Sequence, residues 1–475
     1  MATGYKTTIG LEVHVQLATN TKLFCGCKAR FGQAPNSQVC PVCLGLPGTL
    51  PVLNERAFEL AVKTALALNC RIEKLIKFER KNYFYPDLPK AYQISQFSLP
   101  LSSNGVLEIE TENGPLKIGI TRAHLEEDAG KLIHKQDCSL VDYNRGGTTL
   151  LEIVSDPELH SPQQAYNYLI ALKALLEYLE VSDCNMEEGS LRCDANISLA
   201  KSDSAKLGVK VELKNMNSFK GVRSALSFEE KRITELLKEG ETIVQETRLW
   251  DAEQNKTLLM RAKEESHDYR YFPEPDLVPF AVEKEMVARI KDSLPELPAQ
   301  RKKRFMTDYK LSEYDSSVLT SNKKMADYFE ECLKSHNNPK TLANWIMGDI
   351  SSELNKRKID ISALALKPAG LASLLKMIDR GEISGKIAKD VLAQAIETGS
   401  PPEKIVKSKG LAQIKDTDTL EKIIKEVISK NEKSVSDYKS GKSNAAMFLV
   451  GQVMRQTKGK ANPQLVNKLL KRYLA

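Results

Sequence analysis

Four cysteines near the start of the chain have the spacing of a metal site. Cys25, Cys27, Cys40 and Cys43 form the pattern C-x-C-x12-C-x2-C, in which two close pairs can supply four thiolates to a tetrahedral Zn²⁺. The glycines and prolines around the pairs suit the tight turns that such a site needs. Four protein ligands leave no open coordination position, so we expect a structural zinc ion. The alternative is two pairs of reduced thiols in a loop.

A glutamate and a histidine lie two residues apart in a segment that alternates like a strand. In residues 8–17, Glu12 and His14 share one face, and isoleucine, leucine and valine residues occupy the other. A strand can present two metal ligands in this way. Taken alone, however, the commoner explanation of this pattern is a half-exposed strand whose outward face is simply polar.

Two acidic segments strengthen the interpretation as a metal site. The acidic run 126–128 follows an apolar strand, and Glu152 lies between two aliphatic residues in a strand that otherwise reads as buried. An ionised carboxylate in such surroundings is costly unless it is paired or bound to a metal. The alternative for Glu152 is a salt bridge to Arg122 or Arg145.

The strand predicted at residues 190–199 adds a polar face of a different kind. Arg192 and Asp194 point to the same side, and we select them as candidates for cofactor binding. Glu212, in the strand predicted at 208–213, is a further catalytic candidate. Such faces suit a concave, metal-bearing floor for phosphoryl transfer. The chain contains neither a GxxxxGK[ST] nor a GxGxxG motif, so neither of those routes to ATP is supported.

Two turn-rich segments, 80–97 and 267–276, mix tyrosine, phenylalanine, arginine, lysine and proline. Loops of this composition can stack on and hydrogen-bond a nucleotide or the end of an RNA. An ordered surface loop with half-buried tyrosines has the same composition, and the two interpretations remain open.

Several elements must position these residues. With 475 residues, 41% hydrophobic and 28% charged, the chain has the composition of a globular protein of two to four domains. Strands predominate up to about residue 290, with alternating segments also at 105–112 and 117–125. Helices are expected at 54–68 and 161–179, and in the second of these Ser161 suits the capping position and Pro162 the first helical position. A proline-punctuated linker near residue 292 leads into helices expected at 323–335, 342–355 and 369–379.

Simpler features of the sequence indicate the cell compartment and whether the chain contacts a membrane. We see no signal or transit peptide and no apolar run long enough to span a bilayer. The nine cysteines are an odd number, and five of them are scattered singly, which argues for a reducing compartment. We therefore expect a cytoplasmic protein that does not contact the membrane.

Positive charge is concentrated in the last part of the chain. Residues 401–475 contain 16 lysines and arginines against 7 acidic residues, a balance of +9, so residues 1–400 carry −2 of the total of +7. This distribution indicates a polyanion partner held by the tail. An apolar helix is expected at 445–454, and Lys442, Arg455, Lys458 and Lys460 around it would reach phosphates. A solvated lysine-rich surface is the alternative.

Long, irregular motifs run in order through nearly the whole chain: IGLEVHVQL, RKNYFYPDLPKAYQISQF, HLEEDAGK, DYNRGGTTLLEIVSDPE, MEEGSLRCDANISL, VELKNMNSF, DYRYFPEPDL, NWIMGDI, GKIAKDV and FLVGQVMRQTKGKANPQLVNKLL. Together they resemble the B-type subunit (the GatB family) of the glutamyl/aspartyl-tRNA amidotransferase. The resemblance implies an α+β fold. It would comprise an antiparallel-sheet cradle similar to that of glutamine synthetase at 1–292, a helical domain at 293–400 and a small YqeY-like, tRNA-binding helical tail at 401–475.

The resemblance also implies a reaction. The family corrects mischarged Glu-tRNA(Gln) or Asp-tRNA(Asn). The B-type subunit uses ATP and Mg²⁺ to phosphorylate the side-chain carboxylate of the attached amino acid. Ammonia, which the A-type amidase subunit releases from glutamine and a channel delivers, then displaces the phosphate. A C-type subunit wraps the other two, so that the enzyme is a heterotrimer. Which of the two mischarged tRNAs serves in the cell, and which residues line the channel, are not determined by the sequence.

The resemblance assigns roles to individual residues. It places Mg²⁺ binding on Glu12, His14, Glu127 and Glu152, with Glu127 also catalytic. Lys81, within the motif RKNYFYP, is expected to hold the phosphates or the substrate. Two other functions compete with this one. One is a free-standing glutamine-synthetase-like ligase for a small substrate, against which the basic tail argues. The other is a non-catalytic tRNA-binding scaffold, against which the acidic constellation argues.

Overall fold

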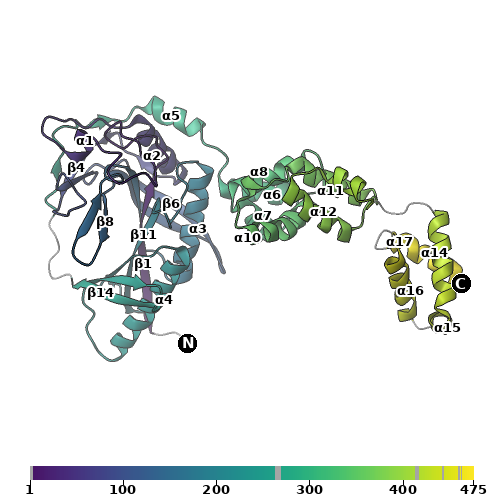
Figure 1. The fold of residues 1–475 in the computed structure, drawn as a ribbon. Coiled ribbons are helices and arrows are strands. Elements are labelled where there is room, and N and C mark those ends of the chain that lie inside the picture. Colours follow the sequence, from purple (N-terminus) through teal and green to yellow (C-terminus); the bar gives the residue numbers. More distant parts are fainter. Residues whose placement is uncertain are drawn as a thin grey trace. The chain divides into compact units, whose positions relative to one another are not determined.

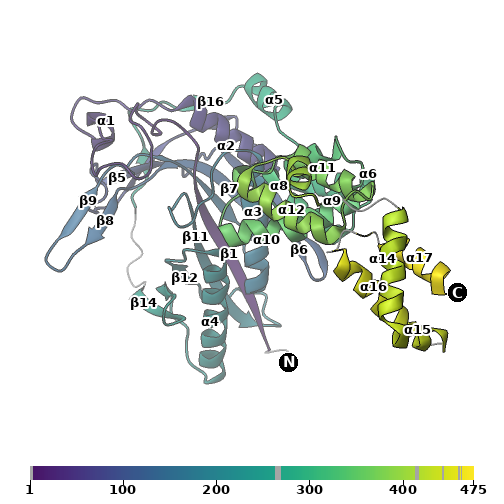
Figure 2. The same ribbon diagram turned by 45° about the vertical axis from the view of Figure 1, so that its right-hand side comes forward.

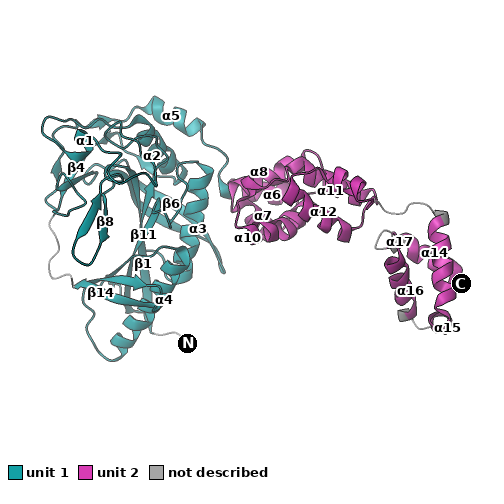
Figure 3. Cartoon of the chain, viewed as in Figure 1, with its two compact units in different colours: residues 1–298 teal, residues 299–475 magenta. Residues whose placement is uncertain are grey.

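The computed structural model describes residues 4–262, 269–411, 417–440, 443–457, 461 and 463–474. The chain divides into two compact units, residues 1–298 and 299–475 (Figure 3). All strands within the described residues belong to the first unit. The three-domain division expected from the sequence, with boundaries after residues 292 and 400, stays a prediction.

The first unit is built on a nine-stranded sheet with the order β14-β13-β12-β11-β1-β10-β7-β6-β2 (Figure 1). β1 (Tyr5–Gln16) is the middle strand, between β10 (Thr149–Ser155) and β11 (Leu191–Lys201). The remaining strands are β2 (Arg71–Ile72), β6 (Ser102–Thr111), β7 (Gly114–Glu127), β12 (Val211–Lys214), β13 (Glu246–Asp251) and β14 (Lys256–Ala262). All five strands expected from alternation are present, although the one expected at 208–213 begins only at Val211.

One pair of strands departs from the expected antiparallel cradle. β12 and β13 run parallel, whereas the other neighbours in the large sheet are antiparallel. Parallel strands need a crossover connection, and α4 (Phe219–Lys238), a helix that was not expected from the sequence, supplies it. The sheet is therefore mixed at this edge, and the α+β class is confirmed.

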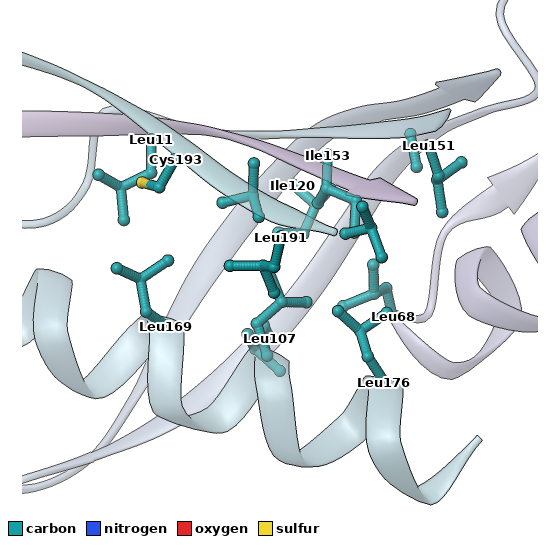
Figure 4. Packing of buried hydrophobic residues seen from close by; sticks show 14 of the residues in the cluster. Leu11, Leu68, Leu107, Ile120, Leu151, Ile153, Leu169, Leu176, Leu191 and Cys193 are labelled. Atoms are coloured by element: carbon teal, nitrogen blue, oxygen red, sulfur yellow. The ribbon is translucent and has the colours of Figure 1, made fainter. Parts of the chain in front are cut away.

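Aliphatic side chains fill the space between the large sheet and its helices. The β1 residues on this side, and Leu17 just beyond the strand, are at most 2% exposed, namely Ile9, Leu11, Val13, Val15 and Leu17. Figure 4 shows Leu169 and Leu176 of α3 (Pro162–Tyr178) packed against residues of β1, β6, β7, β10 and β11. Because side chains alternate along a strand, the other face of β1 is left for the polar residues.

Smaller elements complete the first unit. β15 (Phe272–Pro273), β4 (Glu79–Asn82) and β5 (Tyr92–Ser95) form a three-stranded sheet. β8 (Lys131–His134) and β9 (Ser139–Asp142) form a hairpin that projects from the unit (Figure 2). The other elements are β3 (Leu75–Ile76), β16 (Phe280–Ala281), α1 (Pro41–Leu44), α2 (Glu55–Ala67) and α5 (Lys284–Asp292).

Both helices that the sequence predicts in the first unit are present, and a side chain caps each of them at its start. The side chain of Asn54 accepts a hydrogen bond from Ala57 N at the start of α2. Ser161 does the same for Gln164 N at the start of α3, where Pro162 takes the first helical position. These caps satisfy amide groups that have no partner within the helix, so both expected helices are confirmed.

The second unit is helical throughout its described residues. One apolar core lies within residues 305–406, in which the three expected helices are present, although a π-helical turn at Ile346–Ile350 divides the second. The helices with this core are α6 (Pro298–Asp308), α7 (Glu313–Thr320), α8 (Lys323–Leu333), α9 (Pro339–Trp345), α10 (Ser351–Arg357), α11 (Pro368–Asp379), α12 (Gly385–Thr398) and α13 (Pro402–Ser408). No helix in the described part of the chain is long and apolar enough to cross a membrane.

The last four helices share an apolar core of their own within residues 420–474. They are α14 (Thr417–Lys430), α15 (Glu432–Lys439), α16 (Ser443–Gln456) and α17 (Pro463–Leu474). The apolar helix expected at 445–454 is therefore confirmed as α16. Of the basic residues singled out around it, Lys442, Lys458 and Lys460 lie outside the described residues.

Candidate active site and metal-binding clusters

The polar face of the central strands brings one histidine and two glutamates together. The register places His14 of β1 opposite Glu152 of β10, which in turn lies opposite His124 of β7. Glu126 follows on the same face of β7. The Nε2 atom of His14 is 3.4 Å from Oε1 of Glu126 and 3.6 Å from Oε2 of Glu152. Ligand atoms of His14, Glu126 and Glu152 all lie within 4.8 Å of one another, and we call these residues the floor cluster.

Opposite charges set the protonation of the floor cluster. Burial would lower the pKa of His14, but its contact with Glu152 and the negative charges of Glu126 and Glu152 raise that pKa to about 9. Burial would raise the pKa of Glu152, yet the charges and contacts of His124 and His14 hold it well below its usual value. Without a metal ion, a protonated His14 therefore neutralises part of the charge of the two carboxylates at neutral pH.

His124 and Ser95 hold the carboxylates of the floor cluster in place. The Nε2 atom of His124, a residue only 1% exposed, is 3.3 Å from Oε2 of Glu152. Its Nδ1 atom is buried and has no hydrogen-bond partner in the described part of the chain. Ser95 Oγ donates to Oε2 of Glu126 at 3.3 Å. Sequence reasoning missed His124, although a histidine and a glutamate two apart on a strand repeat the spacing that drew attention to Glu12 and His14.

The ion pairs of Glu152 differ from the arginine pairs considered from the sequence. Within the described residues its partners are the two histidines. Arg145 instead lies 3.4 Å from Asp128. The guanidinium of Arg122 lies 5.9 Å from the centre of the Phe97 ring.

Glu127 is adjacent to Glu126 but points to the other face of β7. Its carboxylate forms an ion pair with Lys90 and accepts the backbone N–H of Ile94 at 2.8 Å. The structure therefore brings Glu126, and not the expected Glu127, to His14 and Glu152. The physical reason is that neighbouring residues of a strand point in opposite directions.

Arg192 extends the polar floor beside His14, which it faces across the β1–β11 ladder. Its guanidinium donates to Oδ2 of the buried Asp128 at 2.8 Å. The Nε atom of Arg192 is buried and has no hydrogen-bond partner among the described residues. An oriented arginine with a spare donor is suited to an anionic group of a substrate.

Glu12, Asp194 and Glu212 form the next part of the same face. Glu12 lies opposite Asp194 in the ladder and accepts a hydrogen bond from Asn196 Nδ2 at 2.9 Å. Lys214 forms an ion pair with Asp194 and lies 3.1 Å from Glu212. Glu12 thus shares the face of the floor cluster without joining the cluster itself. All of the predicted floor residues except Glu127 lie on this one surface.

Lys81 lies in an aromatic enclosure close to the floor cluster. Its Nζ atom is 4.9 Å from the ring centre of Tyr269 and 5.9 Å from that of Tyr83. Burial would lower the pKa of Lys81, but the negative charges of Glu126 and Glu152, together with nearby tyrosines, raise it. No hydrogen bond or ion pair to the Lys81 ammonium is formed within the described residues, so this group is free to receive an anion.

The four cysteines meet as their spacing predicts. Their sulfur atoms all lie within 4.8 Å of one another, and all four thiols are free of disulfides. The second pair is held by α1, after which Gly45 turns the chain with φ 68°. A Cβ atom on Gly45 would lie 2.4 Å from Cγ of Lys90, so the turn requires glycine. Four converging sulfurs could hold a tetrahedral metal ion.

The donor sets of the two clusters fit different ions. Two carboxylates and an imidazole in the floor cluster leave positions for water and phosphate oxygens, as Mg²⁺ requires in phosphoryl-transfer sites. The cysteine cluster has soft sulfur donors that suit zinc. Lys81 and Arg192, which have unpartnered donors within the described residues, lie on the same side as the first cluster and add positive charge to it.

Comparisons with known proteins give one consistent result. Residues 7–288 match the model of the GatB/GatE catalytic domain, and residues 327–474 match that of the GatB domain. A protein of Caldanaerobacter subterraneus subsp. tengcongensis is 56% identical over 472 residues, and one of Carboxydothermus hydrogenoformans is 53% identical over 476 residues. Each alignment covers 99% of both chains, and both relatives are named as the B-type subunit of an aspartyl/glutamyl-tRNA(Asn/Gln) amidotransferase.

Proposed function

The chain belongs to the GatB/GatE family, and from this membership we propose that it activates the amino acid on a mischarged tRNA for amidation. The substrate is Glu-tRNA(Gln), Asp-tRNA(Asn) or both, and the product carries glutamine or asparagine. The full-length identity to relatives named as amidotransferase subunits supports this function over a free-standing ligase or a non-catalytic scaffold.

The reaction needs an activated carboxylate. A carboxylate resists ammonia because its oxygen is a poor leaving group, whereas an acyl phosphate loses phosphate readily. Transfer of the γ-phosphoryl group of ATP to the side-chain carboxylate releases ADP and forms that acyl phosphate. Ammonia then forms the amide bond, and inorganic phosphate leaves. The protein's task in the first step is to hold two anions together and stabilise their charge.

The observation that carries the proposal is the floor cluster with cationic donors beside it. His14, Glu126 and Glu152 would hold Mg²⁺, which would supply positive charge to balance that of the phosphates. Lys81 approaches from the aromatic enclosure and Arg192 from β11, and both have donors that can orient phosphate oxygens. Glu12, Asp194 and Glu212 line the same face, where we propose roles for them in ligand binding and catalysis.

We propose a different role for Glu127 from the other carboxylates. The hydrogen bond from Ile94 N joins Glu127 to β5, and the ion pair with Lys90 joins it to the segment just before that strand. The backbone O of Glu127 also accepts from Gln93 Nε2 at 2.7 Å. Glu127 would therefore fix the end of β7 and so position Glu126.

Ammonia would come from partner proteins. We propose that the chain works in a heterotrimer with an A-type amidase subunit, which releases ammonia from glutamine, and with a C-type subunit. The names of the relatives, as parts of an amidotransferase, support a multi-subunit enzyme. The free thiols of the chain agree with the cytoplasmic setting of such a complex.

The tail would bind the tRNA. One face of α16 is buried in the tail core, with Leu449 and Val453 at 0% exposed, whereas Met447 is 69% and Phe448 46% exposed on another. Gly451 lies near them, and a Cβ atom added to this glycine would have no other atom within 4 Å. An exposed glycine inside a helix costs about 1 kcal/mol relative to alanine. This apolar surface lies in a basic segment and leaves room for a partner to approach the helix closely. Both features support docking of folded RNA.

The cysteine cluster would bind one structural zinc ion. Elemental analysis of purified, chelator-washed protein is expected to give about one zinc per chain, and less than a tenth of that would contradict the proposal. Because a closed site with four cysteines contributes folding energy, Cys25→Ser should lower the thermal stability of the chain.

The experiment that tests the function is an amidation assay on the assembled complex. The chain is co-expressed with the A-type and C-type partners and supplied with each mischarged tRNA, glutamine, ATP and Mg²⁺. The wild type should amidate at least one of them. Glu126→Gln should abolish ATP-dependent amidation and leave the glutaminase activity of the amidase partner intact. Full amidation by this variant would remove the floor cluster from the mechanism.

A further inference from the structure

Lys22 is a lysine whose side chain is completely buried, at 0% exposed. Its Nζ atom donates to the backbone O of Tyr143 at 3.2 Å and to Sγ of Cys43 at 3.6 Å. No carboxylate lies within ion-pair distance of it in the described residues, unlike Lys90 nearby, which pairs with Glu127. Among the described residues, the only group within hydrogen-bond distance of its ammonium that can carry a negative charge is thus a cysteine of the metal-binding cluster.

A buried ammonium group without a counter-ion is expensive. Removing such an ion from water costs several kcal/mol even after relaxation, and a partner must supply opposite charge at close range. A neutral thiol and a backbone carbonyl supply only dipoles. Four cysteine thiolates around one Zn²⁺, in contrast, carry a formal charge of about −2. The burial of Lys22 is therefore explained when the cysteines are thiolates held by a metal ion.

The backbone fixes Lys22 in this position. Its N–H donates to the O atom of Cys27 at 3.0 Å, within the cysteine loop. The next residue, Leu23, donates to Gly147 O at 2.9 Å and accepts from Asn54 N at 2.8 Å. These bonds hold the backbone of Lys22 beside the cysteine loop, from which its side chain reaches Cys43.

We propose that Lys22 is the charge partner of the metal-bound cysteine centre. Its ammonium neutralises part of the centre's negative charge through Cys43, and the centre in turn makes the burial of Lys22 favourable. This inference rests on the proposed zinc ion and goes beyond it, because it assigns a residue outside the four ligands to the affinity of the site. Groups that contact metal ligands tune metal affinity in this way.

The test compares zinc-loaded and zinc-free protein. Lys22→Met keeps most of the length of the side chain and removes its charge. In the full chain, zinc affinity is measured by competition with a chromophoric chelator, and stability by urea unfolding of both forms. We expect the variant to bind zinc at least tenfold more weakly. The zinc-free variant should be at least as stable as the zinc-free wild type, because the substitution removes an uncompensated buried charge.

A matched control separates charge from general disruption. Lys63 is a half-buried lysine that donates to a backbone carbonyl, Leu179 O, at 2.7 Å, and Lys63→Met should leave zinc affinity unchanged. Lys22→Gln retains a hydrogen-bond donor but lacks the charge, so it should weaken zinc binding as Lys22→Met does. If Lys22→Met does not fold, Lys22→Gln takes its place in the test.

Each negative result has a distinct meaning. A wild type that binds no zinc would overturn the proposed metal site together with the role of Lys22. A wild type that binds zinc, with Lys22→Met and Lys22→Gln within twofold of its affinity, would overturn the role of Lys22 alone. Equal destabilisation of the zinc-loaded and zinc-free forms would likewise show that Lys22 only packs.

Discussion

At the scale of single residues, Glu126 and Glu127 show how alternation along a strand determines which partners a side chain contacts. Both carboxylates are nearly buried, at 3% and 4% exposed, and they follow each other in one acidic run. One faces His14 and the other faces Lys90. Because adjacent residues of β7 point to opposite faces, the two should respond to the same substitution in different ways.

We expect Glu126→Gln to lower metal affinity and Glu127→Gln to lower stability. With Mn²⁺ as a spectroscopic probe of the proposed Mg²⁺ site, electron paramagnetic resonance titration should show at least tenfold weaker binding for Glu126→Gln. Glu127→Gln should stay within about threefold of the wild type. Its free energy of unfolding should fall by about 2–3 kcal/mol, because the largely buried Lys90 side chain loses its counter-ion. The reverse pattern would return the metal site to Glu127.

The sequence predicts some site residues and not others for physical reasons. The faces of Glu12, His14, Arg192 and Asp194 follow from period-two alternation, which survives into the folded sheet. The choice between Glu126 and Glu127 depends on where β7 pairs with β10, and that register is set by tertiary contacts. Lys22 reads as an ordinary surface lysine in the sequence, because only the fold reveals its burial.

At the scale of elements, β4 positions Lys81, and a single buried carboxylate fixes this strand. Glu79 accepts hydrogen bonds from the backbone N–H groups of Phe97 and Ser98 at 2.9 Å and 2.8 Å, and lies 3.0 Å from Nζ of Lys77. Burial would raise the pKa of Glu79, but these partners lower it. The charged form is therefore the one that the fold stabilises.

Glu79→Gln should destabilise the chain in a pH-dependent way. A carboxyl group whose pKa is lowered by folding contributes stability above its unfolded pKa of about 4.3 and loses it as pH falls through its folded pKa. In urea unfolding, the free energy of unfolding of Glu79→Gln should therefore be about 1–3 kcal/mol lower than that of the wild type at pH 7. This difference should shrink below about pH 4. Glu108→Gln, at an exposed position of β6, serves as the control. A difference in unfolding free energy that does not change with pH would mean that the charge of Glu79 does not contribute to stability.

The strands were easier to predict than α4. The buried positions Val222, Ala225, Leu226 and Ile233 follow a helical period, but Glu229 interrupts the apolar stripe at 0% exposed. Its carboxylate is satisfied by Arg232 at 2.7 Å and by Arg248 at 3.1 Å. Arg248 lies on β13, beyond the helix, and a sequence pattern does not show which distant partner makes a buried charge acceptable.

At the scale of the whole molecule, one chain combines the polar floor of its large sheet with a basic tail, which we propose binds the RNA of the substrate. The tail core begins after residue 411, whereas Ile405 and Val406 of α13 belong to the preceding core. A truncation that removes residues 412–475 therefore spares that core. The charge distribution motivates this proposed role for the tail, and the boundary between the two cores shows where the chain can be cut.

Removing residues 412–475 should raise the KM for mischarged tRNA at least tenfold, equivalent to about 1.4 kcal/mol. If the tail neutralises phosphates as proposed, tRNA affinity of the intact chain should also fall steeply with salt, by roughly one released counterion per contact. Steady-state amidation and filter binding at several salt concentrations measure both effects, and glutaminase activity in the complex is the control. Unaltered tRNA affinity after truncation would show that the basic charge is only a solvated surface.

The floor cluster is proposed to convert the amino acid's side-chain carboxylate into an acyl phosphate. Isotope transfer tests it directly. Mischarged tRNA whose side-chain carboxylate carries ¹⁸O is amidated by the assembled complex, and the inorganic phosphate is analysed by mass spectrometry. The account predicts one ¹⁸O atom in each phosphate released, and neither labelled phosphate nor amide with Glu126→Gln. Amide formed with no ¹⁸O in the phosphate would contradict it.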